Sequence, residues 1–368
     1  MLTHLLFFTL GIVFLVGGAE LLVRGASRLA LSVGVSPLVV GLTVVAFGTS
    51  APEMAVSVQS AQAGQTDIAI GNVVGSNIFN VLFILGVSAL IAPLVVNAQL
   101  IRQEVPVMTG VSLLLFALAY DGRIGRGDGA LLFGLLLVYT AFLVVQSRRE
   151  TRRTRAEFAE EIVPTDGWDA HWGVQILMVL GGLALLVLGA GWLLEAAVAF
   201  AKLLGVSELV IGLTIVAAGT SLPEVATSIM ATLRGQRDIA VGNVVGSNTF
   251  NILGVLGASS LAASQPLAVA PVILNFDLPV MTAVAVATLP VFFTGRRIAR
   301  WEGVVFLFYY AAYTAYLILA AQHREELPAF SAMMLYFVVP LTVLTLGIAL
   351  FREWKDLRRA AKHPRARY

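Results

Sequence analysis

A stretch of 45 residues occurs twice in this chain, and this duplication constrains the fold more than any other feature. When residues 36–80 are shifted by 171 positions onto residues 207–251, 29 of the 45 positions are identical. The match weakens beyond this window but continues, since residues 104–108 align with residues 277–281 around a shared proline. The chain therefore consists of two halves that are expected to share one order of helices.

The runs that carry the duplication are too apolar for a soluble domain. Hydrophobic residues make up 58% of the chain and charged residues 12%, whereas a soluble domain has about 25% charged residues. A membrane-spanning helix needs about 20 apolar residues, and the sequence contains eleven such runs. They lie near residues 4–31, 37–62, 70–93, 104–120, 128–146, 172–200, 207–233, 241–263, 276–294, 302–321 and 331–351. The sequence therefore predicts an all-α polytopic membrane protein without a soluble domain.

Each half holds five predicted spans, and this odd number determines how the halves are oriented. The second set of five helices must enter the membrane from the side opposite to the first. We therefore expect two inverted-topology five-helix repeats, a ten-helix core, with one extra C-terminal helix. Many secondary transporters have such repeats, with the substrate site near the midplane between them. The expected divisions are 1–146 (first repeat), 147–171 (cytoplasmic linker), 172–321 (second repeat), 322–351 (additional helix) and 352–368 (basic cytoplasmic tail).

Lysine and arginine are distributed unevenly between the loops on the two sides of the membrane. Twenty of the 24 basic residues fall on one side, and only Arg123, Arg126, Lys202 and Arg324 fall on the other. The side rich in lysine and arginine is the cytoplasmic one by the positive-inside rule. The N-terminus is therefore expected outside the cell and the C-terminal tail in the cytoplasm.

Polar residues repeated by the duplication lie in two adjacent helices of each half. Residues one helical turn apart, such as Thr49 and Glu53, share one face of a helix. Both glutamates occur where no lysine or arginine within the membrane is available as a partner, which argues against a structural ion pair. The repeated polar residues are Thr49, Ser50, Glu53, Ser76 and Asn80 in the first half and Thr220, Ser221, Glu224, Ser247 and Asn251 in the second.

Two prolines, Pro52 and Pro223, interrupt the helices that carry the glutamates. Proline has no N–H and clashes with the carbonyl four residues earlier, so it kinks a helix. We expect the kinks to turn carbonyls of residues 46–48 and 217–219 toward the interior. Irregular backbone at membrane depth is tolerated where it is buried in protein or lines a cavity.

The candidate ligands are all oxygen atoms, which favours a hard cation such as Ca²⁺, Mg²⁺ or an alkali ion. The chain has no cysteine, and its four histidines lie near span ends or in loops, so thiolate and imidazole metal sites are excluded. Two carboxylates carry a charge of −2, which neutralises one divalent cation. Without a cation they would repel each other. The site is therefore expected to take up monovalent ions or protons when the divalent ion leaves, which is the basis of exchange.

The hydroxyl groups have two competing interpretations, because serine and threonine also form hydrogen bonds between packed membrane helices. Ligation and helix packing are both left open for them. Asn80 and Asn251 favour a ligand role, since amides are costly in lipid. The other four asparagines of the duplicated segment are expected to brace the helix breaks; these are Asn72, Asn77, Asn243 and Asn248.

The two Gly-Thr-Ser-x-Pro-Glu motifs, at residues 48–53 and 219–224, and the two Gly-Asn-Val-Val-Gly-Ser-Asn motifs, at residues 71–77 and 242–248, resemble the cation/calcium exchanger superfamily. The similarity is to the prokaryotic sodium/calcium exchangers and covers the whole ten-helix core. It implies a bacterial or archaeal cell (inner) membrane protein that extrudes cytoplasmic Ca²⁺ in exchange for Na⁺ by alternating access.

The resemblance also implies a ligand set. It comprises the carboxylates of Glu53 and Glu224, the hydroxyls and amides of the repeated residues given above, and the backbone carbonyls of Ala46 and Ala217. Several exchangers of this type have an aspartate at the position of Asn80 or Asn251, whereas this chain has asparagine at both. Exchange of Ca²⁺ against H⁺ or K⁺, or transport of another divalent cation, therefore remains an alternative.

Two other function classes have a polar intramembrane site. A channel would pass Ca²⁺ without a counter-ion, and an intramembrane hydrolase would need a nucleophile beside the glutamates. No such nucleophile–base pair accompanies them, so the chain is not expected to be an enzyme. No cofactor, nucleic acid or obligatory protein partner is expected; the partners are Ca²⁺, Na⁺ and the lipid bilayer. Sliding of the first and sixth helices, eased by Gly17, Gly18, Gly181 and Gly182, is expected to switch access.

Overall fold

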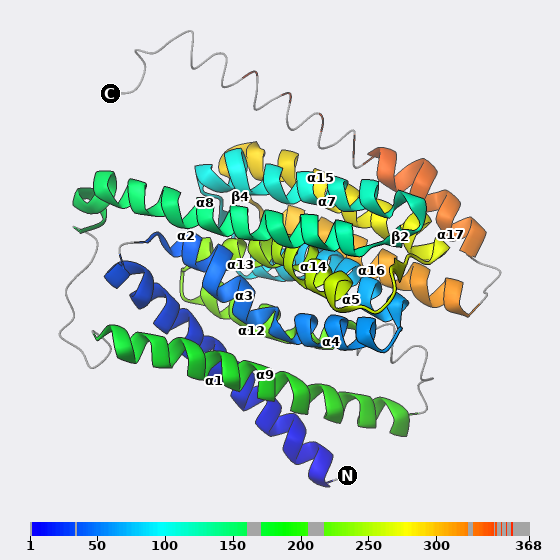
Figure 1. The fold of residues 1–368 in the computed structure, drawn as a ribbon, viewed down its shortest axis with the longest axis horizontal. Helices are drawn as coiled ribbons and strands as arrows, with labels where there is room; N and C mark the ends of the chain where they lie inside the picture. The colour runs from blue at the N-terminus through cyan, green and yellow to red at the C-terminus, as the bar shows by residue number, and fades with distance from the viewer. Residues whose placement is uncertain are drawn as a thin grey trace.

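Long helices make up nearly all of this protein, and they cross one another in one bundle (Figure 1). The computed structural model describes residues 2–33, 35–159, 171–204, 217–322 and 327–341, with isolated positions up to residue 355. The predicted tail at 352–368 therefore lies almost entirely outside the described residues.

The first half begins with a helix of 32 residues and ends with one of 34. Between them lie two interrupted helices, two strands of two residues each, and a third helix that ends in a short turn. In order, the elements are α1 (Leu2–Val33), α2 (Pro37–Val40), η1 (Gly41–Val45), α3 (Ala46–Thr49), α4 (Ala51–Gln62), α5 (Thr66–Phe79), η2 (Asn80–Ile84), α6 (Leu85–Ile91), β1 (Leu94–Val95), η3 (Leu100–Glu104), α7 (Val105–Leu118), η4 (Ala119–Asp121), β2 (Arg123–Ile124) and α8 (Arg126–Ala159).

The second half repeats this order in its described residues. Its elements are α9 (Trp172–Leu203), α11 (Ala217–Gly219), α12 (Leu222–Leu233), α13 (Arg237–Phe250), η7 (Asn251–Leu256), α14 (Gly257–Ala262), β3 (Leu267–Ala268), η8 (Ile273–Asp277), α15 (Leu278–Phe293), η9 (Thr294–Arg296), β4 (Arg297–Ile298) and α16 (Arg300–Ala321), followed by α17 (Leu327–Met333) and η10 (Met334–Val338). The segments η1, η2, η3, η7, η8 and η10 are π-helical, and η4 and η9 are 3₁₀ turns.

Two short antiparallel ribbons join the halves to each other. Strand β1 pairs with β4, with Leu94 opposite Ile298, and β2 pairs with β3, with Ile124 opposite Leu267. Strands β1 and β3 follow corresponding helices of the two halves, as do β2 and β4. Each ribbon therefore pairs the first strand of one half with the second strand of the other half.

Eight helices of the described chain are long and apolar enough to cross a membrane, or nine when the bent pair α2–α3 and α4 is taken as one span. Eleven were expected. The two remaining runs are short in the described part, because residues 207–216 of the run near 207–233 are not described, nor are most residues of the last run after residue 341. The total number of spans is therefore not decided by the described helices.

Two interrupted helices form the centre of the bundle. In the span Arg237–Ala262, all residues of the most apolar 18-residue stretch are buried inside the protein. The buried share of the corresponding stretch is 72% in Thr66–Ile91 and only 6% in α16. These central helices carry the repeated asparagines and serines, because polar groups are excluded from lipid. The candidate ligand side chains are buried, apart from Thr220, which is half-buried.

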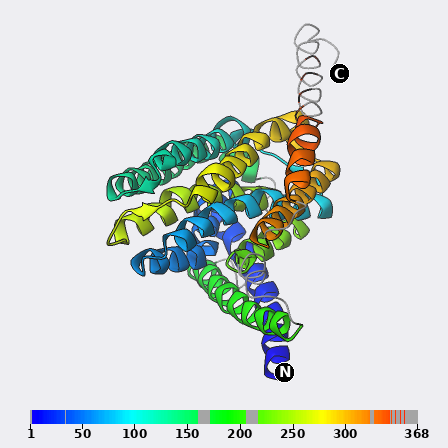
Figure 2. The same cartoon turned by 90° about the vertical axis from the view of Figure 1, so that its right-hand side faces the viewer.

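Helices α1 and α9 pack against each other at one end of the body, crossing beneath the other helices in both views (Figures 1 and 2). Glycine allows this close approach: a Cβ added to Gly18 would lie 2.8 Å from the carbonyl oxygen of Gly182, and one added to Gly182 would lie 2.6 Å from the backbone nitrogen of Leu22. Gly17 makes no close contact, and Gly181 makes only an ordinary one. Two of the four predicted glycines thus join α1 to α9.

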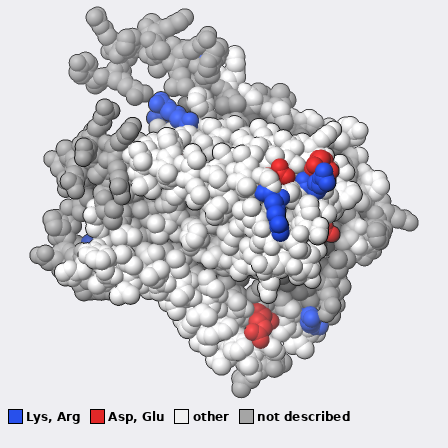
Figure 3. All heavy atoms as spheres, in the orientation of Figure 1, with Lys and Arg blue, Asp and Glu red and all other residues white. Residues whose placement is uncertain are grey.

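Helix α8 extends well past its predicted span end at residue 146, to Ala159. The first part of the expected linker is therefore helical, since its arginine, glutamate and alanine residues favour helix. Most of the described surface in Figure 3 carries no charge. Large apolar side chains such as Leu137, Val138 and Leu177 are exposed. Such a surface is suited to contact with lipid.

Candidate cation site

Both glutamate-bearing helices start at a break in the chain direction. Helices α2–α3 and α4 meet at an angle of 46°, with Ser50 between α3 and α4 and Pro52 in the first turn of α4. In the second half Ser221 precedes α12, whose first turn contains Pro223. The predicted interruption next to each proline is therefore present in both halves.

The carbonyl released by Pro52 lies within the expected range of residues 46–48. Proline leaves the carbonyl four residues earlier without its helical donor, which here is the carbonyl of Gly48. The carbonyl oxygen of Ala46 accepts a hydrogen bond from the backbone N–H of Ser50 at 3.1 Å, and Thr49 Oγ1 lies 3.4 Å from it. Within the expected range, the Ala46 carbonyl therefore keeps its helical hydrogen bond. Ala217 is the first residue of α11.

Each glutamate is fully buried and accepts a hydrogen bond from the opposite half. Ser221 Oγ donates to Glu53 Oε1 at 2.7 Å, and Ser50 Oγ donates to Glu224 Oε1 at 2.9 Å. Because each serine comes from the other half's break, the two breaks must lie side by side for either bond to form. The carboxylates are close enough to interact electrostatically.

Four buried oxygen atoms around this point accept no hydrogen bond from any described residue. They are Glu53 Oε2, Glu224 Oε2, Asn80 Oδ1 and Asn251 Oδ1. Buried polar atoms are nearly always satisfied, so four such atoms of matched chemistry, two from each half, are the candidate ligand atoms. Both amides begin a π-helical segment, η2 and η7, and π-helical turns occur often at functional sites.

The repeated hydroxyl residues differ from one another in their hydrogen-bond partners. Ser76 Oγ lies 3.2 Å from Ser221 Oγ and can donate to it, because the hydrogen of Ser221 goes to Glu53; Ser247 Oγ is buried with no partner among the described residues. Thr49 donates to Asn243 Oδ1 at 3.1 Å. Each of these hydroxyls keeps lone pairs that can accept a hydrogen bond or ligate a cation.

The threonine of the second half makes the matching bond. Thr220 donates to Asn72 Oδ1 at 3.3 Å. Together with the bond from Thr49 to Asn243, this ties each threonine to the opposite half.

Asn72 and Asn243 hold the glutamate-bearing helices in place, as the expected bracing role requires. Asn72 Nδ2 donates to the carbonyl oxygen of Glu53 at 3.3 Å and to Ser57 Oγ at 2.9 Å. Asn243 Nδ2 makes the same two bonds in its half, to the Glu224 carbonyl at 3.4 Å and to Ser228 Oγ at 3.0 Å.

Ser57 and Ser228 were not identified from the sequence. Both are fully buried. They occupy equivalent places in the duplicated segment, four residues after each glutamate. That identity in both halves is a signal that could have revealed them.

No cluster of three or more histidine, cysteine, aspartate or glutamate side chains occurs in the part of the chain that the structure describes. The candidate site instead combines two carboxylates with neutral oxygens. This combination suits Ca²⁺, which is bound by carboxylate, amide and carbonyl oxygens.

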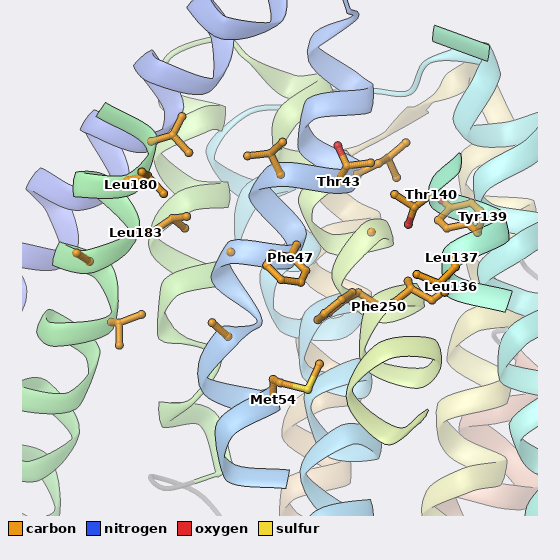
Figure 4. Close-up of a pocket in the computed structure, with 18 of the residues that line it drawn as sticks. Thr43, Phe47, Met54, Leu136, Leu137, Tyr139, Thr140, Leu180, Leu183 and Phe250 are labelled. Carbon is orange, nitrogen blue, oxygen red and sulfur yellow. The ribbon is translucent and has the colours of Figure 1, made fainter. Parts of the chain in front are cut away.

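An apolar groove of about 1120 Å³ lies on the outer side of the first break. Figure 4 shows Leu180 and Leu183 of α9 on one side and Leu136 and Leu137 of α8 on the other, with Phe47 between them. The groove contains almost no polar groups, so it is not the place where a cation would bind. It is separate from the four free oxygens.

Known proteins of similar sequence and structure agree with this arrangement. The family described as sodium/calcium exchanger protein matches residues 3–145 and 174–319. The sodium/calcium exchanger MaX1 of Methanosarcina acetivorans is 35% identical over 345 residues, covering 85% of this chain and 98% of MaX1. The inner membrane protein YrbG of Escherichia coli is 38% identical over 283 residues, covering 75% of this chain and 84% of YrbG.

The fold is also that of a solved exchanger structure. The sodium-calcium exchanger NCX_Mj, soaked with 2.5 mM Na⁺ and 0.1 mM Ca²⁺, is similar with a TM-score of 0.72 and 30% identity, covering 87% of this chain and 98% of that one. Family match, relatives and fold together place this chain among multi-pass membrane transporters rather than enzymes. The chain belongs to the sodium/calcium exchanger family.

Proposed function

We propose that this protein is a secondary antiporter that extrudes cytoplasmic Ca²⁺ in exchange for Na⁺, by alternating access at a site near the membrane midplane. The observation that carries the proposal is the group of four buried oxygens without hydrogen-bond donors, contributed by Glu53, Glu224, Asn80 and Asn251. Both halves contribute equally to it.

The charge of this group accounts for binding and for release. Two carboxylates neutralise one Ca²⁺. A serine hydroxyl of the opposite half donates a hydrogen bond to one oxygen of each carboxylate. When Ca²⁺ leaves, two buried negative charges remain next to each other, and this is costly. Replacement by Na⁺ restores neutrality, so exchange is favoured over simple release.

We further propose that the ligand set is wider than these four oxygens. It includes the hydroxyls near the carboxylates and one backbone carbonyl on each side. A backbone carbonyl has two lone pairs, so hydrogen bonding of the Ala46 carbonyl does not prevent ligation. The proposed ligands are Glu53, Glu224, Asn80, Asn251, Thr49, Ser50, Thr220, Ser221, Ser76 and Ser247, with the carbonyls of Ala46 and Ala217.

The proposed topology is a pair of inverted repeats with the N-terminus outside and the C-terminus in the cytoplasm of a cell (inner) membrane. The odd number of spans predicted for each repeat supports it, as does the predicted collection of arginines on one side. The two ribbons, β1–β4 and β2–β3, make one contact twice with the halves exchanged, as two-fold related repeats require. An additional helix after residue 322 completes the proposed chain path.

Movement of α1 and α9 as one unit is proposed to switch access. Helix α9 packs over both breaks: a Cβ on Gly48 would lie 2.5 Å from the side chain of Leu183, and one on Gly219 would lie 2.6 Å from that of Leu194. Displacement of α9 along its axis would uncover one break while the other stays covered.

Uptake of ⁴⁵Ca²⁺ into sealed vesicles containing the purified protein tests the counter-ion. We expect uptake when the vesicles are loaded with Na⁺ and none with equal K⁺ or with a pH gradient. Equal uptake driven by protons or by K⁺ would contradict Na⁺ as the counter-ion. Uptake with no counter-ion gradient would mean a channel.

A further inference from the structure

Four asparagines meet where the central helices of the two halves cross, and their amides form a closed pattern. Asn77 Nδ2 donates to the backbone carbonyl of Asn248, and Asn248 Nδ2 donates to the backbone carbonyl of Asn77, each at 3.2 Å. Asn77 Nδ2 also lies 3.7 Å from the sulfur of Met281. Backbone carbonyls only accept hydrogen bonds, so the nitrogen of each amide must be the atom that faces the backbone carbonyl of the other half.

This requirement fixes the place of the oxygen in each of these two amides. Asn77 Oδ1 accepts a hydrogen bond from Asn251 Nδ2 at 3.1 Å. Asn248 Oδ1 accepts one from Asn80 Nδ2 at 3.0 Å. Because an amide oxygen cannot donate, Asn80 and Asn251 must turn their nitrogens toward it. Their own oxygens then face away, and these are the two buried amide oxygens without a partner among the described residues.

We propose that Asn77 and Asn248 are positioning residues that orient the amides of Asn251 and Asn80 so that oxygen, not NH₂, faces the cation. An amide turned by 180° would present two N–H donors to a positive charge, which is repulsive. The chain of bonds leads from a backbone carbonyl, through one amide, to the ligand amide of the opposite half. This inference rests on the proposed function, since it names what keeps that same site in its binding form.

A double-mutant cycle tests the inference, because orientation couples particular pairs of residues. The pairs predicted to couple are Asn77 with Asn251 and Asn248 with Asn80, which lie in opposite halves. Asn77 and Asn80 are one helical turn apart on the same helix but do not form such a pair. A role limited to local packing would couple neighbours on one helix instead.

The measurement is equilibrium Ca²⁺ binding by calorimetry, using the purified full-length chain in detergent. We expect Asn77→Ala and Asn251→Ala each to raise the Kd for Ca²⁺ on the order of tenfold, as loss of one hydrogen bond or ligand to a charged group does. Asn77→Ala combined with Asn251→Ala should bind no more weakly than Asn251→Ala alone, because no amide is left to orient. When Asn77→Ala is combined with Asn80→Ala, the fold-changes in Kd of the two single variants should multiply.

Two results would overturn the inference. One is a Kd for Asn77→Ala within about twofold of the wild type, together with a lowered melting temperature. The other is a double variant Asn77→Ala, Asn251→Ala whose fold-change in Kd equals the product of the two single fold-changes. If alanine at position 77 prevents folding, Asn77→Ser and the mirrored cycle of Asn248→Ser with Asn80→Ala give the same test. A wild type that binds no Ca²⁺ would instead refute the proposed function, so the two failures are distinguishable.

Discussion

Replacing Glu224 by glutamine removes one of the two buried negative charges of the site and leaves the shape of the side chain almost unchanged. The amide oxygen of glutamine still accepts the hydrogen bond that Ser50 donates at 2.9 Å. The expected effect is therefore electrostatic. Removing one partner of a buried ion pair costs about 3–5 kcal/mol, which raises the Kd for Ca²⁺ between about 100-fold and a few thousand-fold.

The effect on Na⁺ binding should be smaller. Coulomb energy is proportional to the charge of the ion, so a monovalent cation should lose about half as much, roughly 1.5–2.5 kcal/mol, or between about 10-fold and 60-fold in Kd. Glu53→Gln should behave in the same way, because Glu53 also accepts one serine hydroxyl, at 2.7 Å, and keeps one free oxygen. Calorimetric titration with Ca²⁺ and with Na⁺ measures both ratios.

Glu195→Gln is the matched control, since Glu195 is exposed on α9 and should bind Ca²⁺ as the wild type does. Unchanged Ca²⁺ binding in either site variant would refute the charge argument. A difference of more than about tenfold between Glu53→Gln and Glu224→Gln would refute the equivalence of the two halves. Equal losses for Na⁺ and Ca²⁺ would point to a general disruption of the site.

Three further predictions concern packing, topology and ligand linkage. Gly246→Ala should destabilise the protein by about 1–3 kcal/mol, because the new Cβ would lie 2.6 Å from a backbone oxygen of η1. Gly110→Ala, which has open space around the new Cβ, should leave the thermal unfolding midpoint unchanged. Equal unfolding midpoints for the two variants would contradict the close approach at Gly246. The chain has no cysteine, so single cysteines can be introduced without background: an impermeant thiol reagent should label Ala63→Cys from outside the cell and Arg234→Cys only from the cytoplasm, and labelling of both from one side would refute the inverted topology. Ca²⁺ at 100 times its Kd should stabilise the wild type by about 2.7 kcal/mol, seen as a raised unfolding temperature that chelation reverses; the same increase in Glu53→Gln would argue against this site.

The candidate residues of the site stand out in the sequence because the duplication isolates them. Glu53 and Glu224 follow repeated prolines in otherwise apolar helices, and both are buried in the structure. The family suggested by the two motifs is confirmed. The interruption at Ser50 was also predicted, since the effect of proline on a helix is local.

The features that the sequence could not supply depend on contacts between the halves. The crossed bonds from Ser221 to Glu53 and from Ser50 to Glu224 join residues far apart in the chain. The direction in which the amides of Asn80 and Asn251 face follows from backbone carbonyls of the other half, so no pattern of spacing reveals it.

Smaller differences have local causes. Gly18 lies at the contact of α1 with α9 and Gly17 does not, because the rotation of a helix about its axis is set by packing and not by its composition. The two-residue strands, such as β1 and β4, are too short to leave an alternating pattern. Both kinds of feature appear only when the halves are assembled.

The most direct test of the central claim is the position of the ion itself. Crystals of the protein grown with Ca²⁺ should show one density peak bound by Glu53 Oε2, Glu224 Oε2 and the amide oxygens of Asn80 and Asn251. The distances should be about 2.3–2.6 Å, as in other Ca²⁺ sites. A Ca²⁺ peak coordinated by only one half, or located away from the two glutamates, would contradict the account of a site that both halves build together.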